Sequence, residues 1–311
     1  MGKKPLIILT GPTAVGKTKL SIELAKRING EIISADSMQV YKGMDIGTAK
    51  ITDEEKEGIK HYLIDEIEPN DEFNVVIFQK YAKKYIEEIY SKGKVPVIVG
   101  GTGFYIQSII YDIDFTENET DSSYRIELNK IAEDKGNEYV HNMLREVDPV
   151  SAENIHFNNL KRVIRAIEYF KITGEPISTH NEEQREKTSP YNYRYFVLND
   201  NRDKLYDRIN KRIDIMLDEG LLDEVKELYS KGYNRELVSM QGLGYKEIIA
   251  YLENEISLEE AIYILKRDTR HFAKRQLTWF RREKDVIMIN KDDFNYDDNN
   301  ILEFMINKIK G

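Results

Sequence analysis

The chain has 311 residues, of which 41% are hydrophobic and 32% charged, and its formal net charge is −9. This length suggests about two domains with a folded core. It contains no cysteine, which excludes disulfides, thiol catalysis and cysteine-ligated zinc sites. No apolar run reaches the roughly 18 residues typical of a membrane span, and the N-terminus enters the first expected strand without a signal segment. We therefore expect a cytoplasmic protein.

A glycine-rich loop follows the first expected strand, at 6–10, and leads into a helix-like segment at 19–26. It reads GPTAVGKT and fits the phosphate-loop pattern G-x-x-x-x-G-K-[ST]. In such loops, backbone N–H groups and the positive end of the helix bind an anion, a lysine adds charge, and the last hydroxyl is suited to Mg²⁺. The pattern predicts phosphate or diphosphate binding by Gly11, Pro12, Thr13, Ala14, Val15, Gly16, Lys17 and Thr18. It does not distinguish a diphosphate-using transferase from an ATP-binding or other nucleotide-binding enzyme.

Short β-rich segments recur along the chain at 6–10, 31–35, 62–66, 95–100, 194–198 and 286–289. The early ones alternate with helix-like segments such as 73–91, where apolar residues have helical spacing. Such alternation is typical of a parallel sheet with helices on both faces. We therefore predict an α/β fold, with a P-loop NTPase-like parallel sheet core flanked by helices.

The alternation is interrupted in the middle of the chain. Residues 113–190 open with a polar loop at 116–123, continue as amphipathic helices without a convincing strand, and close with a polar segment at 179–189. This pattern predicts an all-helical insertion domain, with the core split into 1–112 and 191–311. In the second part, 204–231 is expected to form one long helix or a helix pair.

Three polar clusters lie at expected strands: 36–39 follows the second strand, 61–65 covers the third and 100–103 ends the fourth. Because ligands of open α/β sheets bind at the carboxyl ends of the strands, these clusters should surround the phosphate loop. Asp36 is our candidate general base; it could also cap a turn or support a magnesium ion indirectly. Thr102 lies among glycines that let the backbone approach a ligand, or it is part of an ordinary turn. Thr13 could donate to a leaving-group oxygen or only shape the loop.

Basic residues are concentrated in two segments of this acidic chain. Between 263 and 284, eight lysines and arginines stand against two acidic residues, and Lys161, Arg162 and Arg165 share one helix face. A segregated basic face is typical of a protein that binds a polyanion, although two solvated helix faces would give the same pattern. The aromatic residues of the later segment, Phe272, Trp279 and Phe280, fit a core better than a base-stacking surface.

Taken together, these motifs resemble the tRNA dimethylallyltransferase (tRNA isopentenyltransferase) family over nearly the whole chain. The matching stretches are GPTAVGKT at 11–18, DSMQVYKGMDIGTAK at 36–50, HYLID at 61–65, GGTGFY at 100–105, KRVIRAIE at 161–168, TGEPIS at 173–178, RIDIMLDEGLLDEV at 212–225, GLGYKE at 242–247 and AKRQLTWFRR at 273–282. Nine such stretches in the family's order are specific. The chain departs from the family in having Ile51 where proline is usual, and His61-Tyr62 where two histidines are common.

The resemblance implies a prenyl transfer from dimethylallyl diphosphate to the N6 amine of the adenosine beside the anticodon, with Mg²⁺. It implies that residues 11–18 and Arg212 bind the diphosphate, that Thr18 helps to hold Mg²⁺, and that Asp36, Thr13 and Lys17 are catalytic. The implied contacts to the tRNA anticodon stem-loop are Asp36, Ser37, Met38, Gln39, Thr102, Arg125, Lys161, Arg162, Val163, Ile164 and Arg165. We expect a monomer. The alternatives are an isopentenyltransferase acting on free AMP or ADP, a P-loop small-molecule kinase, and an RNA-binding module without activity.

Overall fold

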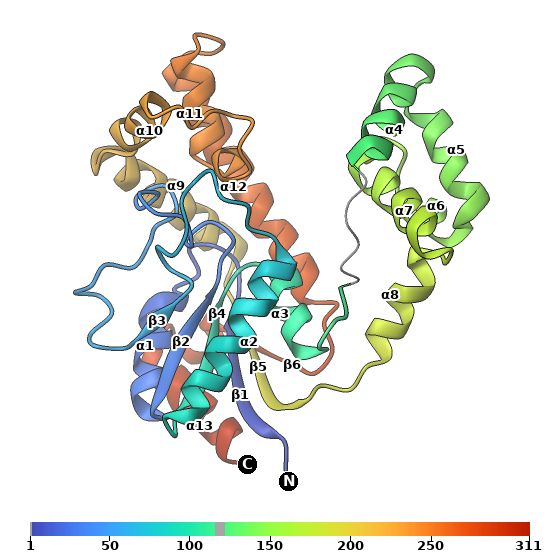
Figure 1. Cartoon of the computed structure of the whole chain (residues 1–311). Helices are drawn as coiled ribbons and strands as arrows, with labels where there is room; N and C mark the ends of the chain where they lie inside the picture. The colour runs from blue at the N-terminus through green and yellow to red at the C-terminus, as the bar shows by residue number, and fades with distance from the viewer. Residues whose placement is uncertain (1, 116–121) are drawn as a thin grey trace. The chain divides into compact units, whose positions relative to one another are not determined.

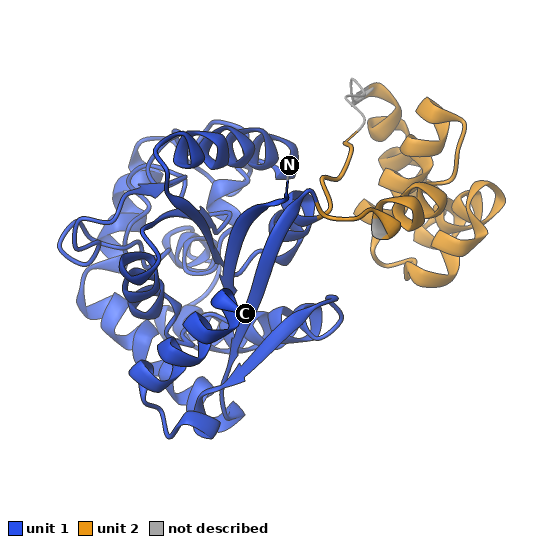
Figure 2. Ribbon diagram, turned by 90° about the horizontal axis from the view of Figure 1, so that it is seen from below, with its two compact units in different colours: residues 1–110, 190–311 blue, residues 111–189 orange. Residues whose placement is uncertain are grey.

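The computed structural model describes residues 2–115 and 122–311, which form two compact units (Figures 1 and 2). Unit 1 comprises residues 1–110 and 190–311, and unit 2 comprises residues 111–189. Unit 2 covers the segment in which the strand–helix alternation is interrupted in the sequence. Among the described residues, no helix is long and apolar enough to cross a membrane.

Unit 1 is built on a sheet of six parallel strands in the order β3-β2-β4-β1-β5-β6. The strands span Lys4–Thr10 (β1), Gly30–Ala35 (β2), His61–Tyr62 (β3), Val95–Gly100 (β4), Tyr191–Asn199 (β5) and Val286–Asn290 (β6). This confirms the predicted α/β core. The central strands read as continuous apolar runs because both faces of a parallel sheet are covered. Leu6, Ile8 and Leu9 of β1 are fully buried.

Helices cover both faces of this sheet (Figure 1). Helices α1 (Lys17–Arg27) and α13 (Asp298–Lys310) pack against each other on one face, while α2 (Val75–Ser91) and α3 (Gly103–Ile110) pack on the other. The start of α2 is fixed by Asn74, whose side chain accepts hydrogen bonds from the backbone N–H groups of Val76 and Ile77.

Four further helices lie beyond the carboxyl ends of the strands, namely α9 (Arg202–Asp218), α10 (Leu221–Ser230), α11 (Tyr245–Leu252) and α12 (Leu258–Phe280). The segment expected to be one long helix or a helix pair is a pair. Gly220 separates its members with a φ of 105°, a left-handed conformation that glycine adopts without strain. Helix α12 packs against both α9 and α3 and so connects these helices to the sheet.

The third strand is shorter than the sequence predicts. The apolar run at 62–66 suggests a full strand, but β3 ends at Tyr62. Leu63 and Asp65 adopt φ values of 60° and 56°, and the Leu63 N–H donates to Oε1 of Glu66. These left-handed residues turn the chain away from the sheet, and hydrophobicity alone does not reveal such a turn.

Unit 2 is helical and has its own core. Its helices are α4 (Ser122–Lys135), α5 (Asn137–Val147), α6 (Pro149–Asn154), α7 (Leu160–Thr173) and α8 (Ile177–Glu186). The residues that fill the core include Leu128, Val140, Leu144, Val163, Ile164 and Ile167. The polar segment at 179–189 lies mostly in helix α8. The polar loop expected at 116–123 lies mostly outside the described residues.

Candidate active site

A pocket of about 430 Å³ opens at the carboxyl ends of β1, β2 and β4 in unit 1. The phosphate loop forms one wall, and helices α9 and α12 contribute others. Its lining includes Thr13, Ala14, Gly16, Lys17, Thr18, Asp36, Gln39, Gly101, Arg208, Lys211, Arg212, Ile215, Phe272 and Gln276. The sequence-predicted loop, Asp36 and Arg212 therefore lie around one cavity. Thr102 follows the lining residue Gly101 directly, and its backbone N–H donates to the Ala35 carbonyl oxygen at 3.1 Å.

The phosphate loop has the backbone conformation that its glycines predict. Gly11 and Gly16 have φ values of 149° and 97°, and Ala14 also lies in the left-handed region at 61°. A side chain at Gly11 would meet the Leu198 carbonyl oxygen at 2.5 Å. The turn at Gly16 leads directly into α1, so the positive end of the helix dipole faces the pocket.

Lys17 is held inside the loop that it follows. Its Nζ donates to the carbonyl oxygens of Gly11 and Pro12, both at 2.9 Å. Burial lowers the pKa of Lys17 to about 8; nearby Asp36 opposes this shift, while Arg212 adds to it. Burial also lowers the pKa of Arg212, against the influence of Asp36 and two glutamates. Two half-buried cations with lowered pKa values therefore face the pocket, a setting suited to an anion such as diphosphate.

Two of the predicted loop contacts have other partners. Pro12 carries no backbone N–H, and its carbonyl accepts from Lys17, so this residue shapes the loop and donates nothing to a ligand. The Thr13 N–H donates to Oε1 of Gln276 at 2.9 Å. Val15 is 1% exposed and packs into the core.

Asp36 follows β2 and reaches the pocket, as predicted. Its Oδ1 accepts a hydrogen bond from the Met38 N–H at 2.9 Å, so the carboxylate also fixes the turn, which was the alternative reading. The side-chain amide of Gln39 forms hydrogen bonds within the protein. Its Oε1 accepts from the Ser34 hydroxyl at 3.1 Å, and its Nε2 donates to the Thr48 and Ala49 carbonyl oxygens, both at 3.3 Å. Ser37 and Met38 are partly exposed beside it.

Sequence reasoning missed two polar residues that hold the loop. Arg208 on α9 donates from Nε to the Ala14 carbonyl at 3.0 Å and pairs with Asp200, whose side chain is fully buried. Gln276 on α12 is 7% exposed and contacts both Thr13 and Gly101. A signal exists for each: Arg208 precedes Arg212 by one helical turn, and Gln276 is a polar residue on a face otherwise formed by Ala273 and Phe280.

Some basic residues of α12 have partners on the same helix or on α9. Arg267 donates to Asp268 at 2.8 Å, and Arg270 donates to Oδ1 of Asn210 at 2.7 Å. Phe280 is fully buried, as expected of a core residue, whereas Phe272 lines the pocket. The basic segment is therefore partly neutralised by its own neighbours.

Within unit 2, the predicted RNA contacts separate into two groups. Lys161, Arg162 and Arg165 are exposed on α7, whereas Val163 and Ile164 are 0% and 2% exposed in the core of the unit. The structure therefore corrects the expectation for the Val163 and Ile164 side chains, which face inward because they fill the apolar side of an amphipathic helix. Arg125 forms a bidentate ion pair with Glu168, with Nε–Oε1 and Nη2–Oε2 distances of 2.9 and 2.7 Å, and its side chain remains partly exposed.

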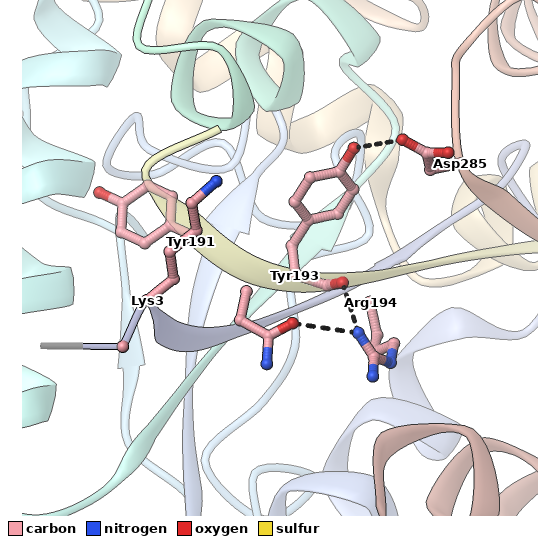
Figure 3. A pocket seen from close by; sticks show the side chains of 7 residues that line it. Lys3, Tyr191, Tyr193, Arg194 and Asp285 are labelled. Atoms are coloured by element: carbon pink, nitrogen blue, oxygen red, sulfur yellow. Dashed lines mark hydrogen bonds between the residues drawn. The ribbon is translucent and has the colours of Figure 1, made fainter. Parts of the chain in front are cut away.

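A second hollow lies at the opposite, amino-terminal end of the sheet (Figure 3). It is a shallow surface groove beside the beginning of β5, lined by Lys3, Tyr191, Tyr193, Arg194 and Asp285. Tyr193 donates to Asp285 at 3.2 Å. This groove contains none of the predicted site residues. Ligands of parallel sheets bind at the other end of the strands, so the groove is not our candidate active site.

Comparisons with known proteins agree with this arrangement. The family model described as IPP transferase matches residues 39–283. A tRNA dimethylallyltransferase from Lachnoclostridium phytofermentans is 69% identical over 294 residues, which cover 94% of each chain. A crystal structure of a tRNA isopentenylpyrophosphate transferase from Bacillus halodurans is 46% identical, with a TM-score of 0.74 and coverage of 99% of this chain and 97% of that one.

A third similar protein was crystallised with its substrate. A structure described as a eukaryotic dimethylallyltransferase acting on tRNA has a TM-score of 0.82 and 32% identity. It covers 97% of this chain, which in turn covers 78% of that chain. From the match to the family model and from these identities over nearly the full length, we conclude that this chain is an enzyme of the IPP transferase family, a relative of the tRNA dimethylallyltransferases.

Proposed function

We propose that this enzyme transfers the dimethylallyl group of dimethylallyl diphosphate to the exocyclic N6 amine of the adenosine adjacent to the anticodon in tRNA. The observation that carries the proposal is one pocket that combines residues of the phosphate loop, two half-buried cations with lowered pKa values and a carboxylate. A diphosphate fits the cationic side, and an amine that must lose a proton fits the side with Asp36.

Catalysis depends mainly on the leaving group. The N6 lone pair is delocalised into the adenine ring, so the amine is a poor nucleophile and the prenyl carbon must become strongly electrophilic. Cleavage of the allylic C–O bond leaves positive charge on carbon and negative charge on diphosphate. Donors already oriented toward that negative charge are each worth about 10²–10³ in rate. Lys17, Arg212 and the amides at the start of α1 supply such donors.

Asp36 accepts the proton released as the C–N bond forms. Its carboxylate lines the pocket and accepts a hydrogen bond from the Met38 N–H. This hydrogen bond orients the carboxylate, so no large conformational change is needed before it accepts the proton. A positioned base of this kind contributes typically 10²–10⁴-fold. Thr13, at the centre of the loop, is our candidate donor to the bridging oxygen that leaves with the diphosphate.

Magnesium fits the oxygen donors at the start of α1. Thr18 is exposed to the pocket, and its hydroxyl oxygen is a hard ligand suited to this ion. When bound, the ion would neutralise part of the diphosphate charge. Thr18 would hold it, while Lys17 and Arg212 would bind the remaining phosphate oxygens.

tRNA binding is assigned to both units. In unit 1, Asp36, Ser37 and Thr102 lie at or beside the pocket, where an adenine turned out of the anticodon loop would enter; such turning costs a few kcal/mol. In unit 2, the exposed Lys161, Arg162 and Arg165 are suited to phosphate contacts.

We propose that the enzyme acts as a monomer in the cytoplasm, where its tRNA substrate would be available. Light scattering of the purified chain tests whether it is a monomer.

Mass spectrometry of tRNA nucleosides tests the function directly. Unmodified tRNA is incubated with the enzyme, Mg²⁺ and dimethylallyl diphosphate, and N6-isopentenyladenosine is the expected product, with a transcript lacking adenosine beside the anticodon as the control. A parallel reaction with ATP in place of the prenyl donor should give no phosphorylated product. Prenylation of free AMP or ADP but not of tRNA would overturn the proposal.

A further inference from the structure

Gln276 joins two loops that are separate in the sequence and meet at the pocket. Its Oε1 accepts a hydrogen bond from the Thr13 N–H at 2.9 Å, and its Nε2 donates to the Gly101 carbonyl at 3.0 Å. The side chain is 7% exposed and comes from α12, a third element. One buried amide therefore connects the phosphate loop with the loop after β4.

The chemistry of this bridge fits only a side chain with one donor and one acceptor. Thr13 offers a backbone N–H and Gly101 offers a carbonyl oxygen, so the bridging group must accept on one side and donate on the other. The amide of glutamine does both. Gly101 also has no side chain for a spatial reason, since a Cβ there would clash with Nε2 of Gln276.

The bridge spans the two halves of the proposed reaction. Thr13 belongs to the loop assigned to the diphosphate, and Gly101 precedes Thr102, which is assigned to the RNA side. Because the Thr13 N–H is committed to Gln276, it is not one of the amides directed at the diphosphate. The hydrogen bond between Thr13 and Gln276 instead fixes the position of the phosphate loop relative to the acceptor side of the pocket.

We propose that Gln276 is a positioning residue that fixes the separation between the diphosphate loop and the acceptor loop. The inference rests on the proposed prenyl transfer. Gln276 acts through Thr13 and Gly101. Loss of its side-chain amide should therefore lower kcat far more than it weakens the binding of either substrate. Reaction rates are sensitive to displacements of about 1 Å, which cost on the order of 100-fold.

Two variants separate positioning from packing. Gln276→Met keeps the volume and removes both hydrogen bonds. Gln276→Glu keeps the shape and, when ionised, sets a carboxylate oxygen against the Gly101 carbonyl; when protonated, it restores one donor and one acceptor. Thr278→Ala, at an exposed position of α12, is the matched control.

We expect both variants to lower kcat for tRNA prenylation about 10- to 100-fold, with the KM for dimethylallyl diphosphate and the affinity for pyrophosphate changed less than about threefold. Thr278→Ala should match the wild type.

Two results would overturn the inference. They are a wild-type kcat in Gln276→Met, and losses of kcat and pyrophosphate affinity in equal proportion, which would indicate a merely structural residue. If Gln276→Glu does not fold, Gln276→Met alone decides. A wild-type enzyme without prenylated product would defeat the proposed function itself, and the parallel wild-type assay distinguishes that outcome.

Discussion

The pocket of unit 1 and the basic face of unit 2 are built in different ways. In the pocket, partners come from distant parts of the chain: Gln276 reaches Thr13 across 263 positions, and Arg208 reaches Ala14 across 194. In unit 2, basic side chains project from α7, which is supported by a core of neighbouring helices, and the Arg125–Glu168 pair spans 43 positions. The pocket therefore requires the whole of unit 1 for its geometry, whereas the basic face requires only a stable helix.

The largest effects are expected inside the pocket. Lys17→Ala and Asp36→Ala should each lower turnover at least tenfold, and by about 10²–10³ where a developing charge loses its donor. Single-turnover prenylation of purified tRNA measures this, with circular dichroism as the folding control. Near-wild-type rates in either folded variant would refute the assigned role.

The low pKa of Lys17 predicts an alkaline limit. Because burial brings that pKa to about 8, below its ordinary value of 10.5, the ammonium is present below pH 8 and is lost above it. kcat/KM for dimethylallyl diphosphate should therefore fall roughly tenfold per pH unit above that point. A profile that stays flat to about pH 10 would show that the charge on Lys17 is not needed.

Arg208 tests how much the pocket depends on distant support. Arg208→Ala removes the contact to Ala14 and leaves the buried Asp200 without its cation, which should cost about 1–3 kcal/mol of stability and raise the KM for dimethylallyl diphosphate. Arg202→Ala, an exposed change on the same helix, is the control. Denaturant unfolding and steady-state kinetics measure the two effects, and equal values in both variants would count against the proposed anchoring.

Unit 2 should respond more weakly and only toward RNA. Arg165→Ala should weaken tRNA binding a few-fold and reduce the slope of log K against log salt by about 0.7–0.9, while pyrophosphate binding stays constant. Lys130→Ala gives the same charge change at another exposed position of the unit. Filter binding at several salt concentrations is the measurement; a slope unchanged by Arg165→Ala would remove this residue from the interface.

The smallest effect concerns the buried side of α7. Ile164→Val should cost about 0.5–1.5 kcal/mol of stability, because Ile164 fills the core of unit 2. tRNA affinity, measured where the variant is folded, should not change. A specific loss of tRNA affinity at full stability would mean that the side chain contacts RNA after all.

The two regions also differ in how far the sequence predicts them. The phosphate loop and Asp36 were predicted at the pocket because each follows an expected strand, whereas Arg212 was predicted only through the family resemblance. Arg208 and Gln276 were not, because their roles depend on partners about two hundred positions away. In unit 2, the family resemblance assigned the whole stretch 161–165 to RNA, although helical periodicity separates the exposed Arg165 from the buried Ile164. The early end of β3 depends on left-handed residues that no simple pattern marks.

A crystal structure with an unreactive analogue of dimethylallyl diphosphate and an anticodon stem-loop tests the central claim most directly. We predict the diphosphate against residues 13–18, with Lys17 and Arg212 on its oxygens, and the adenine N6 within hydrogen-bonding distance of the Asp36 carboxylate. A donor bound away from this loop, or an Asp36 side chain directed away from the adenine, would contradict the account.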